Sequence, residues 1–393
     1  YWKVLPGQGL YYNPDLLTPK GKVRIEGHCT DIVTDLAVEW LKDSREDSKP
    51  FMLMVQHKAP HRNWMPAPRH LALYDDIEIP EPNTLFDKWH DNAPPARFQE
   101  LEIDRHMHLN FDLFVDLHPA FDGNAIKGRY DKSAWRNMQR MSENQLATWQ
   151  AAYGPKDKAF HARKLTADSL VRWKFQRYAK NYLRCIKGVD ESVGRVMEKL
   201  EELKLAGNTL VIFTSDNGGF AGATRHDPLR ANKGSHYEGG IRVPLIVTGA
   251  GVAGGGRVSE VPVITNDLYP TILEMLGLPA RPHQHVDGVS LASIVNGSGD
   301  LRRKALFWHY PHYNKHPQSA PVSIVRRGKW KLIEFLEREE FELYDLEDDI
   351  GEKMNLAAKE TKLVNELNEV LQGWKRRVGA EAMKPNPQFR EKR

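Results

Sequence analysis

The chain has 393 residues, of which 40% are apolar and 27% are charged, and its formal net charge is +4. This length suits one large α/β domain with a smaller one beside it. No apolar run approaches the length of a membrane span and no nucleic-acid-binding motif is present, so we expect neither a membrane span nor a nucleic-acid partner.

The first predicted elements are a helix and a strand. A helix is expected over residues 30–43, with Thr30 as its cap. Its apolar residues recur at helical spacing on one face: Ile32, Val33, Leu36, Ala37, Trp40 and Leu41. The apolar run Phe51–Gln56 follows Pro50 and predicts a buried strand.

Three longer segments follow this strand. Residues 59–100 contain many prolines and are expected to form an ordered, extended excursion. Residues 100–160 are polar and aromatic, and we interpret them as a helical insertion. A long helix is predicted over residues 166–203, with a break near Gly188.

The next elements indicate an α/β sheet. Residues 209–214 are apolar or β-branched and predict a central parallel strand that is covered on both faces. Residues 243–247 predict another strand. A helix is expected over residues 267–276, with Pro270 in its first turn and Gly277 just past its end. Strands that alternate with helices favour a parallel or mixed sheet with helices on both sides.

The pattern changes after about residue 300. Residues 323–335, with a turn at Arg327-Gly328, and residues 341–346 predict antiparallel strands. Residues 361–378 predict an amphipathic helix with its apolar side chains inward: Leu363, Leu367, Val370, Leu371 and Trp374. We therefore expect two domains, a catalytic α/β domain over residues 1–300 and a small α+β subdomain over residues 301–393.

The sharpest chemical signal is Ser215–Gly219, which directly follows the strand predicted over residues 209–214. Asp216 and Asn217 are hard oxygen donors suited to Ca²⁺ or Mg²⁺, and open α/β sheets bind ligands at the carboxyl ends of their strands. The alternative is an Asn-Gly turn that only leads the chain out of the strand.

A second signal is Lys233–Pro244, a glycine-rich loop before the strand predicted over residues 243–247. A lysine in such a loop is well placed to hold an oxyanion. The spacing does not fit a Walker loop. The alternative is a surface loop with a solvated lysine.

A third signal is His57–Trp64, where His57, Lys58, His61 and Arg62 gather after the Phe51–Gln56 run. They indicate an anion site, unless they form only a solvated charge cluster. Together, the three signals predict a metal beside an anion pocket, which suits the hydrolysis of a phosphate or sulfate ester.

These segments resemble the motifs of the sulfatase family, in the order in which the family has them: Thr214–Gly218, Lys233–Pro244 and Asp267–Thr271. The segment His57–His61 resembles the family's central histidine motif. Leu343–Leu346, followed by Glu352 and Asn355–Ala357, is similar to its C-terminal subdomain. The resemblance covers nearly the whole chain.

The resemblance implies an alkaline-phosphatase-like α/β fold and a role for each matching residue. Asp216 and Asn217 would be ligands of a single Ca²⁺. Lys233 would contact the sulfate and neutralise charge on the bridging oxygen, and His61 would donate to a sulfate oxygen or to the leaving group. Four further residues are expected to lie in the substrate pocket: His57, Lys58, His226 and His236.

The family's formylglycine nucleophile is made from the Cys (or Ser) of a Cys-x-Pro-x-Arg motif, and neither Cys29 nor Cys185 matches it. The paired aspartates that complete the metal site are also missing. We therefore expect an N-terminally truncated chain whose nucleophile lies outside it, and which alone binds Ca²⁺ poorly and is inactive.

The expected partner is a sulfated carbohydrate. Residues 1–200 resemble sulfatases of 6-O-sulfated amino sugars in mucin or heparan, whereas residues 214–393 resemble the arylsulfatase and galactosamine-sulfatase branch. The resemblance implies a periplasmic, extracellular or lysosomal location; the sequence predicts no oligomeric state.

Three alternatives stay open. A phosphate or phosphonate monoester hydrolase of the same superfamily would carry more metal charge. A non-catalytic glycan-binding protein would have lost its nucleophile. A basic nucleic-acid binder rests only on the small positive charge, and it predicts a steep salt dependence of binding.

Overall fold

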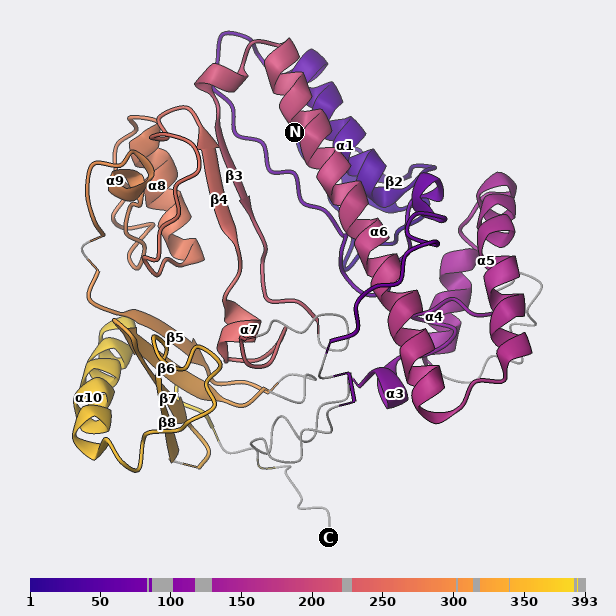
Figure 1. Ribbon diagram of the computed structural model, residues 1–393. Helices are drawn as coiled ribbons and strands as arrows, with labels where there is room; N and C mark the ends of the chain where they lie inside the picture. The colour runs from indigo at the N-terminus through magenta and orange to yellow at the C-terminus, as the bar shows by residue number, and fades with distance from the viewer. Residues whose placement is uncertain are drawn as a thin grey trace. The chain divides into compact units, whose positions relative to one another are not determined.

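The computed structural model describes residues 1–82, 85–86, 102–116, 129–220, 228–301, 303–313, 319–338, 340–384 and 387 (Figure 1). The chain forms two compact units. Unit 1 comprises Tyr1–Lys88 and Glu100–Ala206, and unit 2 comprises Trp89–Gln99 and Gly207–Arg393. The domain division at residue 300 remains a prediction.

Unit 1 is mostly helical. Its described elements are β1 (Asp15–Thr18), β2 (Gly21–Arg24), α1 (Cys29–Glu39), a π turn (Trp40–Ser44), a short 3₁₀ turn (Pro68–His70), α3 (Ile103–His106), α4 (Arg129–Met138), α5 (Glu143–Arg163) and α6 (Ala167–Glu202). Strands β1 and β2 pair as an antiparallel hairpin. Helix α1 runs alongside α6 (Figure 1). The helical insertion is confirmed over residues 129–160, by α4 and α5, whereas within residues 102–116 only the short α3 is helical.

Helix α1 begins one residue earlier than predicted, and its cap differs. His28 occupies the cap position, while Thr30 lies in the first turn and is 1% exposed. The Cys29 N–H donates to the Tyr11 carbonyl at 2.7 Å, so tertiary contact anchors the first turn in place of a side-chain cap. The helix was predicted correctly and its cap was wrong.

The predicted strand Phe51–Gln56 is wrong. This segment joins no ladder with the strands of the described ranges, and its burial alternates. Met52 and Met54 are 67% and 65% exposed. The apolar run indicated burial, but a strand also needs a partner along its edge, and a hydrophobic pattern does not supply one. Residues 57–82 continue without regular structure apart from the 3₁₀ turn, and most of the excursion beyond residue 82 falls outside the described residues.

Helix α6 is continuous, so the predicted break near Gly188 is also wrong. A Cβ at Gly188 would lie 3.9 Å from the His70 ring and from the Thr30 side chain. Gly188 therefore lies against α1 and the 3₁₀ turn, and this packing outweighs the weak helix propensity of glycine.

The described residues of unit 2 form two sheets and several helices. Its main described elements are β3 (Leu210–Thr214), α7 (Glu238–Ile241), β4 (Leu245–Gly249), α8 (Leu268–Met275), α9 (Ala292–Val295), β5 (Leu306–Tyr310), β6 (Val322–Arg327), β7 (Trp330–Phe335), β8 (Glu340–Asp345) and α10 (Thr361–Val378). The helix predicted over residues 267–276 is confirmed as α8, and Gly277 follows it with a positive φ of 65°.

Strand β3 is confirmed, but its predicted parallel pairing is wrong. It pairs antiparallel with β4, with Ile212 opposite Val247. Phe213 and Ile246 are 41% and 56% exposed, so the strand is not covered on both faces. The sequence pattern showed that the segment is apolar but not which strand lies beside it.

The predicted C-terminal antiparallel sheet and its helix are confirmed. Strands β5, β6, β7 and β8 form an antiparallel sheet in that order, and Gly328 makes the β6–β7 turn with a positive φ of 57°. Strand β5 had not been predicted. Helix α10 packs on one face of the sheet in a core formed by Val325, Leu332, Leu343, Val364, Leu367 and Leu371. Of the predicted inward residues, Leu367 and Leu371 are fully buried and the others are half-buried. Within the described residues, no helix combines the length and the apolar character needed to cross a membrane.

Candidate functional site

The first group of site residues follows β3. We call Ser215–Gly219 the Asp216 loop. Asp216 is exposed and Asn217 is half-buried. The Ser215 hydroxyl donates to the Asn217 carbonyl at 3.1 Å, and the Thr214 hydroxyl donates to the Pro244 carbonyl at 2.9 Å. These bonds fix the backbone of the loop and leave the Asp216 carboxylate in solvent.

A second loop, Ala231–Gly240, here the Lys233 loop, is joined to the Asp216 loop through backbone groups. Gly218 N donates to Gly240 O at 3.0 Å, and Lys233 N donates to Gly219 O at 2.8 Å. A Cβ added at Gly218 would lie 1.9 Å from Gly239 O. Only glycine permits this approach, so the two loops are held together, and Lys233, which is half-buried, makes one of the two backbone contacts.

The Asp216 loop provides the donor chemistry of a Ca²⁺ site but not a complete shell. Asp216 and Asn217 are hard oxygen donors, whereas Ca²⁺ takes six to eight oxygen ligands. In the part of the chain that the structure describes, no group of three or more His, Cys, Asp or Glu residues could hold a metal ion. Asp216 and Asn217 can therefore contribute ligands but do not form a metal site by themselves.

His236, also in the Lys233 loop, is buried in an aromatic environment. Its ring centroid lies 4.3 Å from that of Tyr237 and 5.4 Å from that of Phe335. Neither ring nitrogen has a hydrogen-bond partner among the described residues. Burial, aided by the nearby Lys331 and Arg230, lowers the pKa of His236 to about 3, so the imidazole is neutral. Its predicted place in a substrate pocket stays a prediction.

The histidine loop, His57–Trp64, belongs to unit 1 and is fixed by Tyr11. The Tyr11 hydroxyl donates to the His61 carbonyl at 2.7 Å. Lys58 Nζ lies 4.8 Å from the centre of the same ring, a cation–π contact. His61 Nδ1 lies 2.5 Å from the Arg62 carbonyl. Tyr11 therefore contacts the chain at two of the predicted site residues.

A buried ion pair holds the next residue of the histidine loop. Arg62 Nε and Nη2 donate to the two Asp112 carboxylate oxygens, both at 2.6 Å. The Asp112 side chain is fully buried and that of Arg62 is 13% exposed. The Asn63 amide donates to the Phe111 carbonyl at 3.0 Å. The bidentate Arg62–Asp112 pair fixes the orientation of the guanidinium as well as its distance from the carboxylate.

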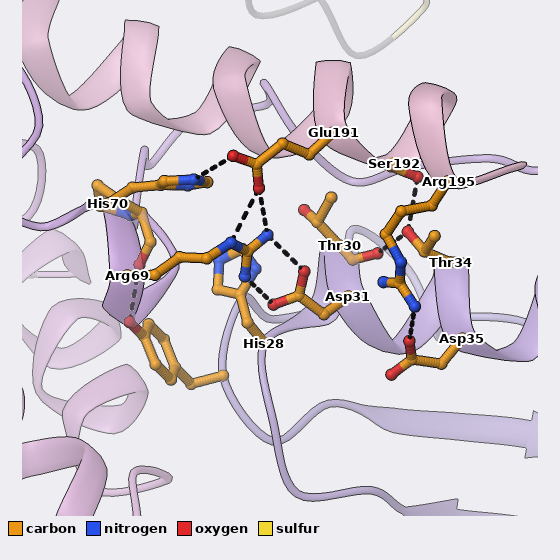
Figure 2. A network of polar contacts seen from close by, with 12 residues as sticks. His28, Thr30, Asp31, Thr34, Asp35, Arg69, His70, Glu191, Ser192 and Arg195 are labelled. Carbon is orange, nitrogen blue, oxygen red and sulfur yellow. Dashed lines mark hydrogen bonds and ion pairs between the residues drawn. The ribbon is translucent and has the colours of Figure 1, made fainter. Parts of the chain in front are cut away.

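His57 lies in a polar network between α1 and α6. Its Nε2 lies 2.8 Å from the Ser192 hydroxyl, which lies 2.6 Å from the Thr34 hydroxyl. Figure 2 shows the neighbouring contacts, in which Arg69 bridges Asp31 and Glu191. The network also includes His70 with Glu191 and Arg195 with Asp35. The His57 ring is thus fixed to α6 by its Nε2.

The His57 contact predicts a pH dependence. Burial lowers the pKa of His57 from 6.5 to about 4, although Asp31 acts in the opposite direction. The folded chain therefore binds this proton less readily than the unfolded chain, so the stability from neutral His57 is present above pH 6.5 and is lost as the pH falls towards 4. Between pH 7 and pH 5 we expect the loss to be about 2 kcal/mol. Urea unfolding at pH 7 and at pH 5 measures this loss, and in the variant His57→Gln the loss should be smaller by the part that His57 contributes. An equal loss in both proteins would contradict the assignment.

The structure groups the predicted residues by unit. Asp216, Asn217, Lys233 and His236 lie in unit 2, where backbone bonds unite their loops. Lys58 and His61 lie in unit 1 with His57. His226 falls outside the described residues.

The sequence assigned no individual role to two buried aspartates, Asp267 and Asp112. Asp267 begins the Asp267–Thr271 motif and is fully buried; its carboxylate accepts from Arg303 at 2.6 Å and from the N–H groups of Val289 and Ile264. The motif therefore fixes the chain around α8. Asp112 gave no sequence signal, because its partner lies 50 positions away.

Comparison with known proteins identifies the family. The sulfatase family model matches residues 1–278, and a model described as the C-terminal region of N-sulphoglucosamine sulphohydrolase matches residues 231–377. An N-acetylglucosamine-6-O-sulfatase of Bacteroides thetaiotaomicron is 31% identical over 91% of this chain. Arylsulfatase K of Canis lupus familiaris is 26% identical over 91% of the chain. The match spans 63% and 57% of the lengths of these two relatives.

A solved structure, of a protein in complex with its substrate D-glucosamine-2-N,6-O-disulfate, superposes with a TM-score of 0.81 at 29% identity. The match covers 99% of this chain and 78% of that chain. The predicted alkaline-phosphatase-like α/β fold, with its C-terminal antiparallel sheet and helix, is thereby confirmed.

Proposed function

This chain belongs to the sulfatase family, and we propose that it supplies the metal-binding and anion-binding residues for hydrolysis of a carbohydrate sulfate ester. The proposal rests on the backbone hydrogen bonds that join the Asp216 loop to the Lys233 loop. An ammonium group and two hard oxygen donors are thereby held on adjoining backbone segments at the end of β3. Such an arrangement serves a tetrahedral oxyanion beside a cation.

Each residue has a proposed role. Asp216 and Asn217 contribute two ligands to one Ca²⁺, which, when bound, would neutralise charge on the sulfate. Lys233 binds the sulfate and stabilises the negative charge that grows on the bridging oxygen as its bond to sulfur breaks. His61 donates a proton or a hydrogen bond to that oxygen or to a sulfate oxygen. Four residues are assigned to the surrounding pocket: His57, Lys58, His226 and His236.

The nucleophile is proposed to be a formylglycine outside these 393 residues. Cys29 and Cys185 are the chain's two cysteines, and neither lies in a Cys-x-Pro-x-Arg motif. Both are buried, and burial raises the pKa of Cys29 to about 11 and that of Cys185 to about 12. Buried thiols of this kind are poor nucleophiles. We therefore propose that the isolated chain does not turn over.

The proposed substrate is an O-sulfated amino sugar. Support comes from the relative named as an N-acetylglucosamine-6-O-sulfatase and from the structure bound to a glucosamine disulfate. A location in the periplasm, outside the cell or in a lysosome remains part of this proposal.

The test is an assay of the complete gene product beside the 393-residue chain, on N-acetylglucosamine-6-sulfate and on the matching phosphate ester. We expect sulfate release from the complete protein and none from the 393-residue chain. The variant Lys233→Ala should lower kcat by about 10²–10³-fold. As a matched control, Lys329→Ala removes a lysine that pairs with Asp345 in the C-terminal sheet and should leave kcat unchanged.

Two results would overturn the proposal. Release of phosphate in preference to sulfate would indicate a phosphomonoesterase, and binding of the sugar without release of either ion would indicate a glycan-binding protein. Sulfate release by the 393-residue chain alone would overturn the assignment of the nucleophile.

A further inference from the structure

A fully buried lysine in the C-terminal sheet holds two buried carboxylates. Lys331 Nζ, from β7, lies 2.9 Å from a Glu238 carboxylate oxygen and 2.8 Å from Glu352 Oε1. The side chains of Lys331 and Glu352 are fully buried, and that of Glu238 is 3% exposed. We call Glu238, Lys331 and Glu352 the buried triad.

The buried triad sets two carboxyl groups against one lysine, and burial raises the pKa of Glu352 although Lys331 acts in the opposite direction. A neighbouring arginine adds a second positive charge beside Glu238. Arg326 Nη1 lies 3.6 Å from the other Glu238 carboxylate oxygen. Burial acts to raise the pKa of Glu238, but Lys331 and Arg326 outweigh it and the pKa lies below its ordinary value. Burying such charges costs several kcal/mol per ion, and well-packed apolar residues often stabilise a fold as well or better. Stability alone therefore does not account for the buried triad.

Glu238 connects the sheet to the Lys233 loop. It is the first residue of α7, and its backbone N–H donates to Glu352 Oε2 at 2.7 Å. The next two residues join this part of the loop to Arg230 and to the Asp216 loop. Gly239 N donates to Arg230 O at 2.8 Å, and Gly240 O accepts from Gly218 N at 3.0 Å. A continuous set of short contacts thus leads from Lys331 to the residue after Asn217.

The start of the Lys233 loop is held by the neighbouring strand, β8. Arg230 Nη1 donates to the Tyr344 hydroxyl and to the Glu352 carbonyl, both at 2.8 Å, and its guanidinium lies 3.8 Å from the Tyr237 ring centre. The Tyr237 hydroxyl donates to Glu342 at 2.8 Å. The sheet therefore holds the loop at both ends and leaves Lys233 between them.

From these contacts we propose that Lys331 and Glu352 are positioning residues for the site, which through Glu238 fix Lys233 and the Asp216 loop. The inference rests on the proposed function for the chemistry that Lys233 performs. It assigns the C-terminal sheet a direct part in the geometry of the anion site, although neither residue touches the substrate.

Hydrogen–deuterium exchange on the 393-residue chain and on the complete gene product tests this proposal. In Glu352→Ala, amides of residues 215–219 and 231–240 should exchange about tenfold faster or more, while amides of β5 and β6 keep their rates. Glu352→Gln keeps an acceptor for the Glu238 N–H and should give a smaller increase. Lys331→Met leaves the two carboxylates together without their cation and should give the largest increase in loop exchange. If this variant fails to fold, the two Glu352 variants still test the proposal.

The matched control is Lys375→Met. Lys375 pairs with Glu334 of β7 at 2.9 Å in a mostly buried contact that does not involve either loop. Its removal should leave exchange in both loops unchanged. Uniform acceleration over the sheet and the loops in Glu352→Ala would show a merely structural role, and unchanged loop exchange would also overturn the inference.

Kinetics separate this inference from the proposed function. In the complete gene product, Glu352→Gln should lower kcat for sulfate release more than it changes KM, because Lys233 acts mainly on charge that develops in the transition state. If no sulfate ester is hydrolysed but loop exchange accelerates, the proposed function fails and the positioning role stands. If hydrolysis occurs and the variants alter neither kcat nor exchange, the positioning role fails alone.

Discussion

Replacement of Asp112 by alanine is expected to lower the free energy of unfolding by about 3–5 kcal/mol. The change removes the two carboxylate acceptors of the Arg62 guanidinium, which keeps its bond to the His106 carbonyl, and it removes the acceptor of the His108 N–H. The Arg62 side chain, only 13% exposed, then loses the buried carboxylate with which it pairs. Urea unfolding followed by circular dichroism would measure the loss, and the histidine loop should become more sensitive to proteolysis.

Two further variants serve as comparisons for Asp112→Ala. Asp190→Ala removes an exposed ion pair with Lys187 and should cost well under about 1 kcal/mol. The double variant Arg62→Met/Asp112→Leu removes both charges and should recover much of the lost stability. A loss below about 1 kcal/mol in Asp112→Ala would mean that the bidentate pair does not hold the histidine loop.

Gly218→Ala is the second change with a large expected effect. The added methyl group would lie 1.9 Å from Gly239 O, so the Asp216 and Lys233 loops must separate. We expect a cost of about 3 kcal/mol in the free energy of unfolding. In the complete gene product, sulfate release should fall about 10²-fold, because a displacement of this size moves Lys233 away from Asp216 and Asn217.

Gly255→Ala provides the control, since a Cβ there meets no atom within 4 Å. Its stability and activity should match those of the parent chain. Parent-like hydrolysis by Gly218→Ala would show that the two loops need not be joined for the site to work.

The sequence predicted those elements whose signals are local. Gly277 marks the end of α8 and Gly328 marks the β6–β7 turn, and both have the positive φ expected of such glycines. The amphipathic pattern of residues 361–378 gave α10 its correct bounds. By contrast, the partner of β3 could not be predicted, because pairing depends on β4, which follows more than thirty residues later.

In the candidate site, too, residues with local sequence signals could be predicted, whereas residues that depend on distant partners could not. The motif residues Asp216, Asn217 and Lys233 could be selected because glycines and a strand flank them. Lys331 could not, because its burial depends on Glu238, 93 positions away. One signal was present: a lysine on the inward-facing side of the apolar strand Trp330–Phe335 is unusual enough to suggest a buried partner. Asp112 offers no such signal, since it lies in an irregular segment.

The network in Figure 2 also bears on how unit 1 folds. His70 and Glu191 are 121 positions apart, and His57 and Ser192 are 135 apart. Contacts between such distant residues form only after the chain has closed a very long loop, which slows folding. The histidine loop should therefore acquire its final geometry late in refolding, after α1 and α6 have formed and docked.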